Sequence, residues 1–233
     1  AVYASPRYTE RQVLWENLSK TSDLHNKPWI IAGDFNEPLA DEDKFGGRPV
    51  SINRSLLFKD CLDNCNMVDM GFNGPKFTWT NRREISSLIQ ERIDRFFMNP
   101  IWCLLYPDAK VTHLTRCHSD HYPLLMETNP CRPMQMNRPF KFQSFWLSDP
   151  SFPSVVNQAW RHPRNLREAI DIFATQANMW NKNHFGNIFH KKKRIMAHLN
   201  GVQKAMANQP SSFLVLLENQ LLKELEIVLE QEK

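Results

Sequence analysis

Short polar groups at the ends of apolar runs are the parts of this sequence that could do chemistry. The first is Gly33-Asp-Phe-Asn36, in which Asp34 could accept a proton from water or hold a metal ion and Asn36 could donate to an oxyanion. In an extended chain, side chains two residues apart point to the same side. A turn that closes a strand is the simpler interpretation of this group alone, because Gly, Asp and Asn are common turn residues.

The second group, Ser119-Asp-His121, lies where a polar loop meets an apolar strand. Adjacent strand residues point to opposite faces, so one of Asp120 and His121 could orient or ligate while the other acts as a general base or phosphate donor. A zinc site is the alternative, although no spacing here matches a known zinc pattern. The neighbours that could join such a site are His113, Cys117 and His118.

The third candidate is Asp94, which lies between Arg92 and Arg95 in an otherwise apolar strand. A carboxylate that points inward from such a strand needs a partner, and a histidine on a neighbouring strand would serve. A surface Asp–Arg pair is the alternative.

Alternating and continuous apolar runs predict the elements that must position these residues. The run at 28–32 predicts a strand buried on both faces, which places Asp34 at its C-terminal end. Further strands are predicted at 2–5, 76–80, 92–97, 109–114 and 122–126, with short helices following residue 9, residue 56 and Pro100. The proline-rich segment 128–141 predicts a linker, and apolar residues at helical spacing predict helices over 142–233.

Composition and charge narrow the functional classes. With 42% hydrophobic and 23% charged residues the chain can bury a core, and no apolar run approaches the roughly 20 residues of a membrane span. Five Cys without a C-x-x-C motif argue against a disulfide framework. Residues 1–131 carry 15 basic and 17 acidic residues, whereas 132–233 carry 14 and 8. The basic run Lys191, Lys192, Lys193 and Arg194 is therefore a candidate nucleic-acid contact, with a solvated helix face as the alternative.

Four motifs occur in order along the chain: W-I-I-A-G-D-F-N at 29–36, F-T-W-T at 77–80, R-I-D-R-F-F at 92–97 and S-D-H-Y-P-L at 119–124. Together they resemble the endonuclease/exonuclease/phosphatase family, the group of deoxyribonuclease I and the apurinic endonucleases. Within the family the sequence is most similar to the endonuclease domain of plant LINE-type (non-LTR) retrotransposon polyproteins. The resemblance covers 1–127, the C-terminal part of that domain. Residues 142–233 resemble the helical connector that precedes the reverse transcriptase.

The resemblance implies an α+β fold, namely part of the two-sheet sandwich of deoxyribonuclease I, followed by an all-helical extension. It also implies site residues at matching positions. Catalytic roles fall to Asp34, Asn36, Asp94, Asp120 and His121, phosphate binding to Tyr3, Asn36 and His121, and a metal-side position to Asp120. Phe77 and Trp79 would support the wall beside the DNA strand or simply pack in the core.

The implied activity is Mg²⁺-dependent phosphodiester hydrolysis that nicks DNA in the nucleus, with the reverse transcriptase of the same polyprotein as a partner and no membrane. The Asn and metal-binding Glu of the family's N-terminal half would lie before Ala1, so we expect impaired activity and weak Mg²⁺ binding. A non-catalytic remnant whose helices bind a partner or nucleic acid is the alternative. A phosphatase or deadenylase of the same family is a further alternative.

Overall fold

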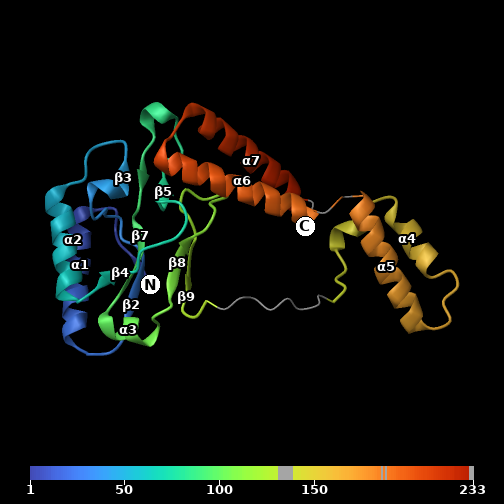
Figure 1. Ribbon diagram of the computed structural model, residues 1–233, viewed down its shortest axis with the longest axis horizontal. Coiled ribbons are helices and arrows are strands. Elements are labelled where there is room, and N and C mark those ends of the chain that lie inside the picture. The colour runs from blue at the N-terminus through green and yellow to red at the C-terminus, as the bar shows by residue number, and fades with distance from the viewer. Residues whose placement is uncertain (131–138, 185, 187, 231–233) are drawn as a thin grey trace. The chain divides into compact units, whose positions relative to one another are not determined.

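The computed structural model describes residues 1–130, 139–184, 186 and 188–230 (Figure 1). The described residues form two compact units. One falls within Ala1–Arg132 and Leu199–Asn219, and the other within Pro133–His198 and Gln220–Lys233. Of the predicted linker at 128–141, residues 131–138 lie outside the described part of the chain. The grouping of residues 199–219 with the first unit is not indicated by the sequence pattern.

A four-stranded sheet with the order β1-β2-β7-β4 is the frame of the first unit. Its strands are β1 (Val2–Tyr3), β2 (Ile30–Asp34), β4 (Val68–Asp69) and β7 (Asp94–Met98). β1 runs parallel to β2, whereas β7 is antiparallel to both β2 and β4. Gly33 permits the close approach of β1, because a Cβ at this position would lie 1.8 Å from the carbonyl oxygen of Val2.

Two smaller sheets complete the strands of the first unit. One has the order β3 (Lys44–Phe45), β6 (Gln90–Glu91) and β5 (Trp79–Thr80), and the other pairs β8 (Lys110–His113) with β9 (Leu124–Glu127). Short helical segments connect these strands: η1 (Asp41–Asp43), η2 (Ile85–Ser87) and α3 (Pro100–Leu105). The mixed arrangement of helices and small sheets is consistent with the α+β, deoxyribonuclease I-like fold.

Two helices, α1 (Tyr8–Asp23) and α2 (Ile52–Asn64), lie side by side at one side of the four-stranded sheet (Figure 1). Aromatic rings form the centre of the core between them and the sheet. Trp15 stacks on Phe58 with ring centroids 4.2 Å apart, and Phe35 meets both Phe58 and Phe97. Because strand side chains alternate, burying Phe35 and Phe97 on this face turns their neighbours Asp34 and Phe96 to the other face.

A buried ion pair holds the chain where it leaves β2. The carboxylate of Glu37 accepts a 2.6 Å hydrogen bond from Arg11 and a second one from Arg54, and the side chains of Arg11 and Glu37 are each only 1% exposed. Such a pair leaves a buried charge uncompensated when one partner is removed.

We therefore expect the variant Glu37→Gln to lose about 3 kcal/mol of unfolding free energy, measured by urea denaturation. Glu10→Gln is the matched control, because the Arg7–Glu10 pair is exposed and such pairs contribute less than about 1 kcal/mol. Equal losses in the two variants would contradict a special role for the buried pair.

The second unit contains η3 (Ser144–Ser148), α4 (Phe152–Ala159) and α5 (Leu166–His184). Its core cluster gathers Trp146, Phe152, Val155 and Ala177. Helices α6 (Ile188–Asn208) and α7 (Ser212–Glu230) contribute residues to both units. No helix in the described ranges is both long and apolar enough to cross a bilayer.

Candidate active site

The two acidic residues Asp34 and Asp94 lie directly opposite each other in the sheet. Asp34 is the last residue of β2, Asp94 is the first of β7, and the register of the antiparallel pair matches them. The sheet thus brings together two carboxylates that are 60 positions apart in the sequence. Such proximity is unfavourable for two anions unless a positive charge lies between or beside them.

His121 supplies the third side chain of the cluster. Its Nδ1 lies 3.0 Å from Oδ2 of Asp94, as expected for a histidine on a neighbouring segment that partners this carboxylate. One ligand atom each from Asp34, Asp94 and His121 fall within 4.8 Å of one another. His121 reaches this place because its backbone bridges to Trp79 of β5.

The surroundings raise the pKa values of two members of this cluster above their ordinary values. The hydrogen bond to Asp94 raises the pKa of His121 above its ordinary value, so the imidazolium is favoured. Burial raises the pKa of Asp34, and the neighbouring Asp94 carboxylate adds to this rise. The site therefore combines a stabilised cation with a carboxylate of increased basicity, a combination typical of acid–base centres.

Asn36 orients Asp34. The backbone N–H of Asn36 donates to Oδ1 of Asp34 over 2.9 Å, and its side-chain amide donates to Oδ2 of Asp34 and to the carbonyl oxygen of Ala4. Asn36 adopts a left-handed backbone conformation with φ of 48°, which Asn tolerates better than most residues. The predicted turn is therefore present, and it fixes the carboxylate of Asp34 in place.

Asp94 is not part of a surface Asp–Arg pair. Its backbone N–H donates to Oγ1 of Thr78 over 2.9 Å, which fixes the start of β7. The flanking arginines instead bind two other carboxylates: Arg92 and Arg95 both contact Asp69, and both pair with Asp43. The carboxylate of Asp94 is therefore available to bind His121.

The remaining predicted site residues lie at the margin of this cluster or away from it. Asp120 is not in the metal-competent trio of the described residues; its Oδ2 accepts a 3.0 Å hydrogen bond from Nε1 of Trp79. Tyr3 is paired in register with Asp34, and its side chain is 73% exposed. Lys191, Lys192, Lys193 and Arg194 lie on α6 within the second unit.

Replacing Asp94 by Asn should lower the pKa of His121, because the carboxylate is the largest cause of its elevation. An NMR titration of the His121 ring measures this value directly. Asp120→Asn is the matched control, since Asp120 has the smallest of the effects that raise the pKa of His121. An equal fall in both variants would show that general negative charge, and not the hydrogen bond, causes the elevation.

The alternative zinc site does not assemble among the described residues. His113 is buried, its Nδ1 lies 2.7 Å from the carbonyl oxygen of Pro75, and its ring stacks on Phe72. Burial lowers the pKa of His113 to about 4, which keeps the imidazole neutral at physiological pH. His113 is thus a core residue, and the group of potential ligands that the described side chains form is the Asp34, Asp94 and His121 trio.

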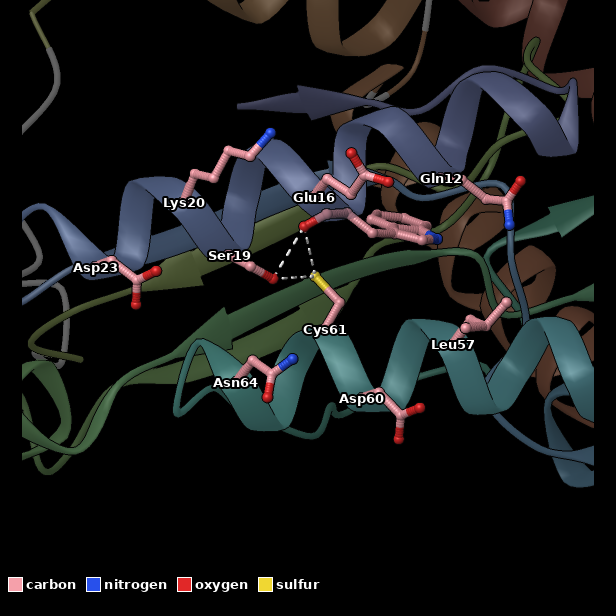
Figure 2. Close-up of a pocket in the computed structure, with 10 residues that line it drawn as sticks. Gln12, Glu16, Ser19, Lys20, Asp23, Leu57, Asp60, Cys61 and Asn64 are labelled. Atoms are coloured by element: carbon pink, nitrogen blue, oxygen red, sulfur yellow. Dashed lines mark hydrogen bonds between the residues drawn. The ribbon is translucent and has the colours of Figure 1, made fainter.

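A separate groove lies between α1 and α2, and Figure 2 shows the residues that line it. At its base, the thiol of Cys61 donates to the carbonyl oxygen of Trp15, and Ser19 binds the same carbonyl over 3.1 Å. Cys61 and Cys65 are both buried, as predicted for a helix face that packs inward. The groove contains none of the proposed catalytic residues.

Comparison with known families agrees with this geometry. The sequence model of the endonuclease/exonuclease/phosphatase family matches residues 1–149. The chain belongs to this family. No curated protein matches the chain. Membership indicates phosphodiester hydrolysis by an endonuclease-like, typically metal-dependent hydrolase, and the acidic cluster provides a place for a metal ion.

Several residues that lie beside the candidate site residues were missed by sequence reasoning. Thr78 was predicted only as part of a strand, although its hydroxyl accepts from the backbone of both Ile93 and Asp94. Glu37 directly follows the first motif, so a buried acidic residue there could have been suspected. Arg116 could not have been recognised, because its partners come from a distant part of the chain.

Proposed function

We propose that this chain hydrolyses phosphodiester bonds in DNA, as the endonuclease part of a LINE-type retrotransposon polyprotein. The observation that carries the proposal is the convergence of Asp34, Asp94 and His121, with ligand atoms within 4.8 Å. The finer assignment to DNA and to retrotransposons is supported by the order of the four sequence motifs. In that role a reverse transcriptase domain would use the nicked DNA, and the site of action would be the nucleus.

The side chains divide the reaction between them. His121, whose raised pKa favours the protonated ring, donates to a phosphate oxygen and stabilises the negative charge that develops there. Asp94 fixes the orientation of that ring through Nδ1. Asp34 orients the attacking water and accepts its proton. Asn36 holds the Asp34 carboxylate in place.

A divalent cation fits the same cluster. The repulsion from Asp94 that adds to the raised pKa of Asp34 would be relieved by a positive charge, and carboxylate oxygens are preferred ligands of Mg²⁺. Asp34 and Asp94 would hold the ion, with His121 beside it. When bound, the ion supplies Lewis-acid stabilisation of phosphate charge. We propose Mg²⁺ with weak affinity, because two carboxylates fill only part of its preferred octahedral shell.

The test is nicking of supercoiled plasmid over a millimolar Mg²⁺ titration, with EDTA as the metal-removal control. The expected result is slow formation of relaxed circles that requires Mg²⁺ and that EDTA prevents. Polyadenylated RNA and a phosphomonoester are assayed in parallel. Preferential hydrolysis of either one would overturn the DNA assignment in favour of a deadenylase or a phosphatase, and hydrolysis of none would favour a non-catalytic remnant.

A further inference from the structure

We propose that the tip of the α6–α7 pair, residues 199–219, is a working part of the nuclease unit that positions the loop carrying Asp120 and His121. The contact is made through Arg116, a positioning residue, and through Gln203 and Glu218. The proposal rests on the proposed function, since its purpose is to hold His121 for hydrolysis. Its structural part is testable without any activity.

Gln203 of α6 clasps the backbone of Arg116. Its Oε1 accepts from the N–H of Arg116 over 3.1 Å, and its Nε2 donates to the carbonyl oxygen of Arg116 over 2.8 Å. Both backbone groups of one residue are thus satisfied by one side-chain amide, as a neighbouring strand would satisfy them. Gln203 is fully buried, so water cannot replace these hydrogen bonds without opening the structure.

Glu218 of α7 neutralises the Arg116 side chain. Nη2 of Arg116 lies 2.5 Å from Oε1 of Glu218, and Nε2 of Gln203 donates to the same oxygen. Arg116 is 1% exposed and Glu218 is 6% exposed. A buried guanidinium without its carboxylate would carry a desolvation penalty of several kcal/mol, so Arg116 keeps this position only because α7 supplies Glu218.

Arg116 in turn holds the catalytic loop. Its Nη1 donates to the carbonyl oxygen of Ser119 over 3.1 Å, and its guanidinium lies 5.4 Å from the ring centroid of Tyr122. These two contacts bracket Asp120 and His121. Gln203 and Glu218, which follow Arg116 by 87 and 102 residues in the sequence, therefore position the loop through the Arg116 side chain.

The other side of the loop is held by backbone hydrogen bonds to residues 78–80. The N–H of Thr80 donates to the carbonyl oxygen of Asp120, and the N–H of Tyr122 donates to that of Thr78. Between Arg116 and Asp120 the loop is polar and largely exposed, and Arg116 binds it at the carbonyl oxygen of Ser119. Without this hydrogen bond the loop is held from one side only.

The experiment compares Glu218→Leu with the double variant Arg116→Met/Glu218→Leu in the full chain. The single variant leaves a buried charge unpaired and should lose stability. The double variant removes both charges, and apolar residues of similar volume often restore stability at such sites. A purely structural role for the pair therefore predicts that the double variant recovers both its melting temperature and its nicking rate.

The positioning role predicts a different outcome for the double variant. We expect recovered stability but a kcat about tenfold lower, with KM for plasmid within about twofold of wild type, since small misplacement of a catalytic group reduces the chemical step. We also expect faster amide hydrogen exchange in residues 117–121. Glu226→Ala, an exposed change on the same helix, is the control and should alter neither quantity.

Wild-type kcat in a stable double variant would overturn the positioning role, as would a lowered kcat with unchanged exchange in the loop. If the wild-type chain hydrolyses no phosphodiester, the proposed function fails by itself. In that case exchange in residues 117–121 still decides the structural claim: acceleration in the double variant supports the anchor, and no acceleration refutes it.

Discussion

Replacing His121 by alanine is expected to reduce the rate of plasmid nicking about 10³-fold, within the range that a positioned general acid contributes. The reason is that His121 is the proposed donor to the phosphate: its Nδ1 lies 3.0 Å from Oδ2 of Asp94, and that hydrogen bond raises the pKa of the ring. The protonated ring would face the phosphate, and alanine offers neither charge nor donor. The measurement is the initial rate of conversion of supercoiled to relaxed plasmid at saturating Mg²⁺.

His118→Ala is the matched control, because His118 lies in the same loop and is exposed. Its nicking rate should stay within about threefold of wild type, as expected for a surface substitution without a role in the reaction. A comparable loss in both variants would point to damage of the whole loop and would remove the argument for His121 as the donor.

Replacing Asp34 by Asn should reduce nicking by a similar factor of about 10³ while leaving the unfolding free energy within about 1 kcal/mol of wild type. The variant keeps the size of the side chain and one acceptor for the Asn36 backbone, but it loses the base and a metal ligand. Its stability is maintained because burial and the repulsion from Asp94 disfavour the ionised carboxylate, as the raised pKa of Asp34 records.

The sign of that stability effect can be checked against pH. A carboxyl whose pKa is higher in the folded than in the unfolded state destabilises the fold once the pH exceeds the unfolded value, and Asp34→Asn removes this effect. Relative to wild type, the variant should therefore gain stability as the pH rises from acid to neutral. Asp63→Asn, an exposed change on α2, should show no such trend. A large stability loss in Asp34→Asn would mean that the carboxylate is structural.

The local elements around the site could be predicted from the sequence, with errors at their ends. Apolar runs predicted the strands that became β2, β7 and β8, because the period of side-chain burial depends on neighbouring residues only. The strand predicted over 76–80 shortens to Trp79–Thr80, since Thr78 uses its hydroxyl to support β7 instead of extending the ladder. Asp34 proved to be the last residue of its strand, close to its predicted place.

The candidate residues were also recognisable, and one contact between them was predicted. Asp34, Asn36 and His121 were singled out as reactive residue types at the ends of apolar runs, and Asp94 as an acidic residue within an otherwise apolar strand. The need of an inward-pointing carboxylate for a partner predicted a histidine from a neighbouring strand beside Asp94, and the 3.0 Å contact shows that His121 is this partner. Asp120 was expected on the metal side of the site and lies outside the trio of potential ligands, in keeping with the rule that adjacent strand residues point to opposite faces.

What the sequence by itself determined was the chemistry available and the local form of each segment, since both depend on residue types and short-range spacing. Only the tertiary structure decided that Asp34 lies opposite Asp94, because strand register is set by burial of Phe35 and Phe97 against the helices. Only it decided that Gln203 and Glu218 support Arg116. The partners of a buried charge are the residues that the fold places next to it, and the helical spacing of apolar residues does not indicate which residues these are.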